Sequence, residues 1–175
     1  QASITGVVRD ASGAVLPGAD RVSYPSNEHI IRSDLPMEAR MTPELFYLLL
    51  TAILTGVLWI PVVIGKVLAR GPLKPEDYKV ERTTPLPDWV NRANRAHLNA
   101  VENFAQFAAV VLIAHVIGVS SAVTAIAAMV YFYARLMHAL VQITGFSLFM
   151  ARTLLFTVSW IAFLAIAVEA LRKAL

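Results

Sequence analysis

Four long apolar stretches follow Met41, and they limit the folds open to this chain of 175 residues more than any other feature. The first covers residues 45–68 and carries no charge before Lys66. A helix rises about 1.5 Å per residue and the hydrocarbon core of a bilayer is about 30 Å thick, so about 20 apolar residues can span it. We therefore predict an all-α integral membrane protein whose four helices cover about residues 43–68, 89–118, 121–144 and 148–171.

The composition agrees with a membrane protein. Hydrophobic residues make up 57% of the chain and charged residues 15%, whereas soluble domains average about 45–50% and about 25%. With no cysteine, the chain has no disulfide, no cysteine-ligated metal and no cysteine nucleophile. The formal net charge is +3. Because the basic residues flank apolar stretches, we expect a lipid bilayer as partner and no nucleic acid.

Residues that commonly cap helices stand at the predicted helix starts. Thr42 is expected to cap the first helix, and Pro61 is expected to kink it. We expect Asp88, Ser120 and Ser147 to cap the other three helices. The last two connections are only a few residues long, which predicts that the second, third and fourth helices pack as antiparallel neighbours in a bundle.

Basic residues are concentrated in and beside the long first connection: Lys66, Arg70, Lys74, Lys79, Arg82, Arg92 and Arg95. Cytoplasmic connections carry an excess of Lys and Arg. We therefore expect the first connection to be cytoplasmic and both termini to face the periplasm or lumen.

Residues 1–40 have a different pattern from the membrane domain at 41–175. The segment ASITGVVRDASGAVLPGA alternates apolar and polar positions around Ser12-Gly13, which is typical of a strand pair. It resembles the start of a carboxypeptidase-regulatory-like β-sandwich. We expect an extramembrane extension that is β-like or disordered.

A polar stripe runs along the second predicted helix. At about 100° per residue, five polar side chains fall within an arc of roughly 80°: Arg92, Arg95, Asn99, Glu102 and Gln106. A face of this kind must contact protein or water, because exposing it to lipid is costly.

A second stripe on the third helix comprises Tyr131, Arg135, His138 and Gln142, and Arg152 opens the fourth helix. The cations outnumber Glu102, so we expect a small anionic ligand such as a carboxylate, held by bidentate pairing. Alternatively, the stripes only join helices, with Glu102 paired to Arg95, Arg135 or an arginine of a neighbouring subunit. A metal or haem is a third interpretation, although no metal-ligand motif is present.

The segments RAHLNAVENF and YARLMHALVQ resemble the MAPEG superfamily, the membrane-associated proteins in eicosanoid and glutathione metabolism, and most closely its bacterial branch. The resemblance covers Thr42 to the C-terminus. It implies a homotrimer in a bacterial inner membrane that binds glutathione between subunits as cosubstrate. It further implies glutathione-binding roles for Arg95, Asn99, Glu102, Arg135 and His138, and a catalytic role toward the thiolate for Arg152. The chain departs from active members at Leu98, Gln142 and Phe156, where they often carry Arg, Tyr and Tyr.

Three functions follow as hypotheses. The first is a MAPEG-like glutathione transferase or peroxidase acting on lipophilic small molecules that are electrophiles. The alternative is a non-catalytic membrane subunit of a larger complex that keeps this fold. The second alternative is a haem- or quinone-binding bundle using His97 and His138.

Overall fold

The computed structural model describes residues 41–80, 82–146 and 150–175, and all regular structure in these residues is helical. Four helical segments among them are long and apolar enough to cross a membrane. The predicted all-α membrane fold is therefore confirmed for the described part of the chain. The predicted strand pair in residues 1–40 lies outside the described residues.

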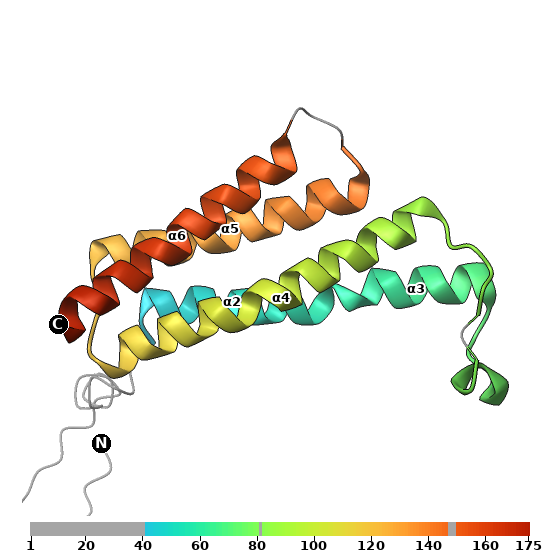
Figure 1. The fold of residues 1–175 in the computed structure, drawn as a ribbon, viewed down its shortest axis with the longest axis horizontal. Helices are drawn as coiled ribbons and strands as arrows, with labels where there is room; N and C mark the ends of the chain where they lie inside the picture. The colour runs from blue at the N-terminus through green and yellow to red at the C-terminus, as the bar shows by residue number, and fades with distance from the viewer. Residues whose placement is uncertain (1–40, 81, 147–149) are drawn as a thin grey trace, which may run out of the picture. The chain divides into compact units, whose positions relative to one another are not determined.

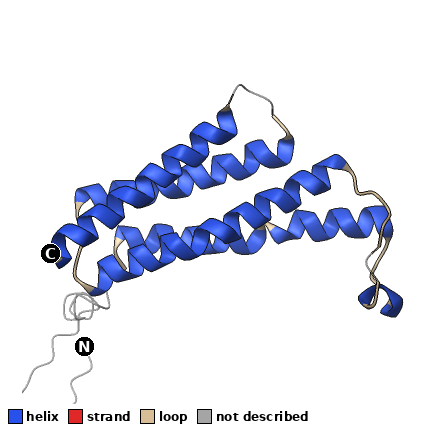
Figure 2. Cartoon of the chain, viewed as in Figure 1, coloured by secondary structure: helices blue, strands red, loops and turns tan. Residues whose placement is uncertain are grey.

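The membrane-spanning segments form an antiparallel bundle (Figures 1 and 2). Its elements are α2 (Pro43–Val57), α3 (Trp59–Arg70), η2 (Pro75–Tyr78), α4 (Asp88–Val116), α5 (Ala122–Thr144) and α6 (Ala151–Ala174). α2 and α3 together make the first span. One end of the bundle, on the right in Figure 1, holds the end of α3, the start of α4, the end of α5 and the start of α6. We call it the loop end.

Capping follows the predictions only in part. Thr42 Oγ1 accepts from the Leu45 N–H at 3.4 Å, as expected. The prediction for α5 was wrong: Ser121, not Ser120, caps this helix, by accepting from the Thr124 N–H at 3.2 Å. Asp88 is also not a cap, because Pro87 occupies that position and Asp88 is the first helical residue.

The last helix begins later than predicted and ends later. Ser147 lies outside the described residues, and α6 starts at Ala151 rather than at residue 148. Met150 precedes it with a φ of +55°, in the left-handed region. This backbone conformation ends the connection and starts the helix without a side-chain cap.

The first span is interrupted at Leu58, between α2 and α3. Pro61 explains the break, because proline has no N–H to give to the Val57 carbonyl and its ring collides with that carbonyl. The kink predicted at Pro61 is therefore present as a change of helix. α2 packs on both α5 and α4, whereas α3 packs on α4.

The first contact joins α2 to α5 through a buried carboxylate. Glu44 is only 3% exposed. It accepts from the Ser120 hydroxyl at 3.2 Å and from the Thr124 hydroxyl. We call Glu44, Ser120 and Thr124 the Glu44 clamp. Glu44 and Thr124 lie in the first turns of α2 and α5, and both helices start at the end of the bundle opposite the loop end (Figure 1).

The second contact is a close approach of α3 to α4 at Gly65. A Cβ at this position would lie 2.5 Å from Val90 Cγ2 and 2.8 Å from Trp89 Cη2. The first of these atoms belongs to a fully buried residue and cannot move away freely. Only glycine therefore allows the two helices to come this close.

Gly65→Ala is expected to destabilise the chain by about 1–3 kcal/mol, the usual range for overpacking. Gly56→Ala is the matched control, since a Cβ there meets nothing within 4 Å and alanine favours a helix by up to about 1 kcal/mol over glycine. Unfolding in detergent measures both. A loss of similar size in both variants would contradict the close approach.

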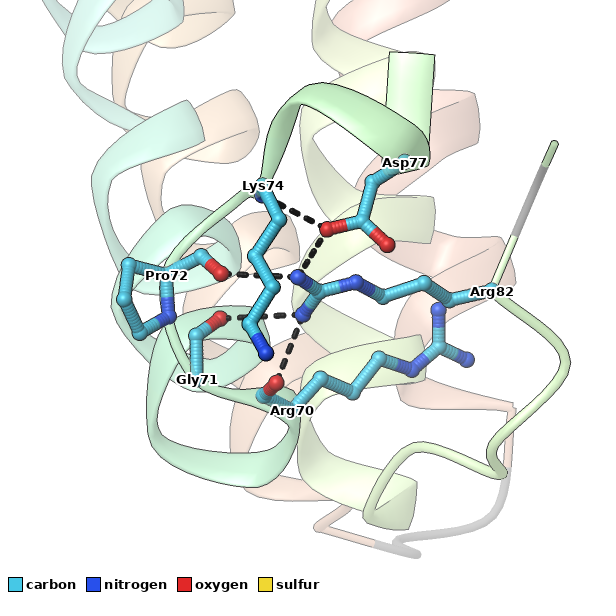
Figure 3. A network of polar contacts seen from close by, with 6 residues as sticks. All are labelled: Arg70, Gly71, Pro72, Lys74, Asp77 and Arg82. Carbon is cyan, nitrogen blue, oxygen red and sulfur yellow. Dashed lines mark hydrogen bonds and ion pairs between the residues drawn. The ribbon is translucent and has the colours of Figure 1, made fainter. Parts of the chain in front are cut away.

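The connection between α3 and α4 is held folded by one arginine (Figure 3). Arg82 donates to the carbonyls of Arg70 (2.6 Å), Gly71 (3.1 Å) and Pro72 (2.7 Å), and it forms an ion pair with Asp77. Asp77 also accepts from the Lys74 N–H at 2.6 Å. We call this set of contacts the Arg82 clasp.

The hydrogen bond from Arg82 lowers the pKa of Asp77 from 3.8 to about 2. A carboxyl group with a lowered pKa stabilises the folded form above its ordinary pKa and loses this effect as the pH falls. We therefore expect a nitroxide label on Tyr78→Cys to gain mobility between about pH 4 and pH 2. The additional change Asp77→Asn should make the label mobile at every pH. A label equally immobile at both extremes would contradict the role of Asp77.

Candidate functional site

A polar cavity of about 530 Å³ lies between the first half of α4, the end of α5 and the start of α6. Nine residues line it: Arg95, Leu98, Asn99, Glu102, His138, Gln142, Arg152, Thr153 and Phe156. Of the six predicted site residues, the structure brings five to this cavity, and the exception is Arg135. Thr153 was not predicted, and no sequence motif marks it.

Arg135 lies behind the cavity wall and holds Asn99 in place. Its Nη2 donates to the Asn99 carbonyl at 2.7 Å and to Asn99 Oδ1 at 2.8 Å. Because Oδ1 is occupied, the donor side of the Asn99 amide is the part available to a ligand. The guanidinium carbon also lies 5.8 Å from the centre of the Phe156 ring, within the range of a cation–π contact.

The charge of Arg135 has no counter-ion in the described part of the chain. The residue is 5% exposed, and no carboxylate of the described residues forms an ion pair with it. Its Nη1 is buried without a hydrogen-bond partner. A buried cation of this kind favours an anion in the adjoining cavity.

On α5 and α6, His138, Gln142 and Arg152 form the opposite wall. Arg152 Nη1 donates to Gln142 Oε1 at 2.9 Å, which fixes the guanidinium at the cavity. The His138 ring lies 6.4 Å from the Phe156 ring, and His138 and Gln142 are both buried. The cavity therefore has cations on two sides, Arg95 from α4 and Arg152 from α6.

Two residues of the predicted stripe on α4 behave differently from the expectation. Arg92 Nε donates to the Ile143 carbonyl at 3.2 Å, near the end of α5, and Gly145 leaves room for it because a Cβ there would lie 2.8 Å from Arg92 Nε. Glu102 forms no ion pair with Arg95 or Arg135 within the described chain. The predicted pairing was therefore wrong for these partners.

Part of the α4 stripe faces outward. Arg95, Glu102 and Gln106 are exposed in the single chain, at different heights of a helix that spans the membrane. Charged and amide groups facing lipid are costly, so these side chains require a protein or water environment. The α5 stripe, by contrast, is buried along its whole length at Tyr131, Arg135, His138 and Gln142.

Two further residues do not contribute to the cavity. The Tyr131 hydroxyl donates to the Asn103 carbonyl at 3.0 Å, and its ring stacks on Phe107 with centroids 3.7 Å apart. His97 is not among the lining residues, and its Nδ1 is buried without a hydrogen-bond partner in the described residues. The two histidines of the haem hypothesis therefore do not share this cavity.

Comparison with known proteins gives one match. The family model described as the MAPEG family matches residues 45–172. No curated protein and no solved structure matches the chain. The matched region begins in α2 and ends in α6, and it includes every residue that lines the cavity.

Proposed function

The chain belongs to the MAPEG family, and from this premise we propose that it is a glutathione-dependent membrane enzyme, a transferase or peroxidase that acts on lipophilic electrophiles. The observation that carries the proposal is the polar cavity at the loop end. Two exposed arginines and a single carboxylate line it, and one buried, uncompensated guanidinium lies behind its wall. Glutathione matches this pattern, since it has two carboxylates, one ammonium group and one thiol.

Each polar group of the cavity has a role in this proposal. Arg95 and the Asn99 amide bind a carboxylate, and Arg135 positions Asn99 through Oδ1. Glu102 accepts from the glutathione ammonium group, and His138 adds a polar contact on the opposite wall. Arg152 stabilises the thiolate, because a guanidinium favours the charged form of a thiol whose pKa is otherwise about 8.5.

In the transferase reaction the thiolate sulfur attacks an electrophilic carbon of the second substrate. A carbon–sulfur bond forms, and the leaving group departs with its electron pair. The contribution of this chain is to hold glutathione and to keep its sulfur ionised beside the apolar part of the bilayer. A lipophilic electrophile reaches that point from the membrane.

A second copy of the chain would complete the site. The exposed side chains of Arg95, Glu102 and Gln106 need cover within the membrane, and a homotrimer with α4 at its centre supplies it. We further propose that the loop end faces the cytoplasm of a bacterial inner membrane, because the basic residues concentrate there.

Isothermal titration of the purified protein with glutathione tests the proposal. Arg95→Ala should weaken binding by about 1.5–3 kcal/mol, the usual effect of losing a hydrogen bond to a charged group. Arg152→Ala should leave binding largely intact but remove the ultraviolet absorbance of the thiolate, because the thiol pKa rises. Arg172→Ala, at the opposite end of α6, is the matched control and should change neither. If millimolar glutathione does not bind, the enzyme proposal is wrong.

One contact favours the alternative of a non-catalytic subunit of a larger complex. The side chain of Arg152 is already bonded to Gln142, at 2.9 Å, and Phe156 offers no hydroxyl to the cavity. Absence of glutathione binding would make this alternative the better account of the cavity.

A further inference from the structure

We propose that residues 73–80, in the connection between α3 and α4, rest on the bilayer surface and bind lipid headgroups. Three apolar or aromatic side chains of this segment are exposed to an unusual degree: Leu73 at 66%, Tyr78 at 79% and Val80 at 72%. None of them contributes to the polar cavity. Several exposed apolar side chains on one short connection indicate a surface that something apolar covers.

The position of the segment favours lipid as the covering material. α3 presents exposed apolar side chains along its length, and the last of them, Leu68, is 76% exposed beside this connection. Figure 1 shows η2 displaced sideways from the end of α3 rather than continuing along its axis. Because α3 crosses the membrane, sideways displacement at its end runs along the bilayer surface. The segment therefore lies at the depth of the headgroups, beside the end of the apolar α3.

The side chains of residues 73–80 are of types that are common in the headgroup region. Tyrosine is enriched at membrane–water interfaces, where its ring meets apolar groups and its hydroxyl meets water. Lys74 and Lys79 are also exposed, and lysines next to a membrane attract anionic lipid phosphates. Asp77 does not oppose this attraction, because its charge is paired with Arg82, and the exposed Glu76 is then one negative charge against two lysines.

The Arg82 clasp gives this surface a fixed shape before any lipid binds (Figure 3). It ties Arg82 to the last carbonyl of α3, to the two carbonyls that follow it and to Asp77 on η2. The apolar side chains are therefore exposed by a folded segment. A preformed surface loses less conformational entropy on docking than a flexible one.

Spin labelling tests the proposal directly, because the chain has no cysteine of its own. Tyr78→Cys and Glu76→Cys are each labelled with a nitroxide in the full chain and reconstituted in vesicles of phosphatidylcholine and phosphatidylglycerol. At three residues per turn, positions 76 and 78 of η2 point about 120° apart. Collisions with oxygen report lipid, and collisions with a water-soluble nickel chelate report water. We expect several-fold fewer chelate collisions at position 78 than at position 76, with more oxygen collisions.

Two outcomes would overturn the proposal. Equal chelate collisions at the two positions would place the segment in water. A label at position 78 that neither reagent reaches would show that protein covers it, either a second copy or another partner.

Two further variants test parts of the proposal. Arg82→Gln should remove the difference between positions 76 and 78, and a persistent difference would show that lipid docking does not depend on the Arg82 clasp. The double change Lys74→Gln and Lys79→Gln should make the label depth insensitive to phosphatidylglycerol, and unchanged sensitivity would refute the role of the lysines.

Discussion

Asn99→Asp is expected to raise the melting temperature of the protein and, at the same time, to weaken glutathione binding at least about tenfold, or about 1.4 kcal/mol. The buried guanidinium of Arg135 bonds Asn99 Oδ1 at 2.8 Å and has no counter-ion in the described residues. An aspartate at this position supplies the missing negative charge from within the chain. It also removes the amide donor and repels the glutathione carboxylates. Thermal unfolding in detergent and isothermal titration measure the two effects.

Asn103→Asp is the matched control for this variant. It adds the same charge one turn further along α4, where Asn103 Nδ2 donates to the Asn99 carbonyl at 2.8 Å. Asn103 does not line the polar cavity. We expect this variant to lower stability and to affect glutathione less than Asn99→Asp does. Stabilisation by both changes, or by neither, would contradict the view that Arg135 is the uncompensated charge.

Glu44→Ala is expected to destabilise the protein by about 3 kcal/mol or more. The buried carboxylate accepts hydrogen bonds from the Ser120 and Thr124 hydroxyls, and a hydrogen bond to a charged group contributes about 1.5–3 kcal/mol. Glu44→Gln should have a smaller effect because the amide oxygen still accepts one bond. Denaturation in detergent, followed by circular dichroism, measures both variants.

Glu169→Gln provides the comparison for the Glu44 clamp. Glu169 forms an ion pair with Arg172 at 3.2 Å, and the Arg172 side chain is 74% exposed. Exposed pairs of this kind contribute about 0–1 kcal/mol. If the changes at positions 44 and 169 lower the free energy of unfolding by the same amount, burial of the Glu44 clamp does not stabilise the fold.

The positions of the membrane spans could be predicted from the sequence because length and hydropathy alone set them. The break at Leu58 was also predictable, since proline has a local effect that does not depend on the rest of the fold. The buried face of α5 followed from spacing: Tyr131 and Arg135 are one helical turn apart and both are buried.

Pairing partners were harder to predict, because they depend on what a neighbouring helix presents. Ser120 was expected to cap its own helix, but Glu44, 76 positions earlier, takes its hydroxyl. Arg92 was counted among the cations available to a ligand, yet it binds the Ile143 carbonyl. Every residue has a backbone carbonyl, so sequence patterns do not show which one a long side chain will reach.

The candidate site, like the fold, could be predicted from the sequence only in part. Helical periodicity brought Arg95, Asn99 and Glu102 to one face, and the structure places all three at the cavity. Arg135 was expected to meet the ligand, but it stands behind Asn99 and acts on it. Arg135 thus lies one layer of side chains further from the cavity than expected. Helical spacing shows which face a side chain is on, but not how deep in the bundle it lies.

The break at Leu58 gives the first span the mechanics of two short rods joined end to end. The Glu44 clamp anchors the first rod to α5, and the close approach at Gly65 anchors the second to α4. A lateral force on the connection that follows Arg70 therefore bends the first span at Leu58 and does not break the hydrogen bonds of the Glu44 clamp. α3 can therefore tilt at Leu58 while α2 keeps its packing on α4 and α5 toward the opposite membrane face.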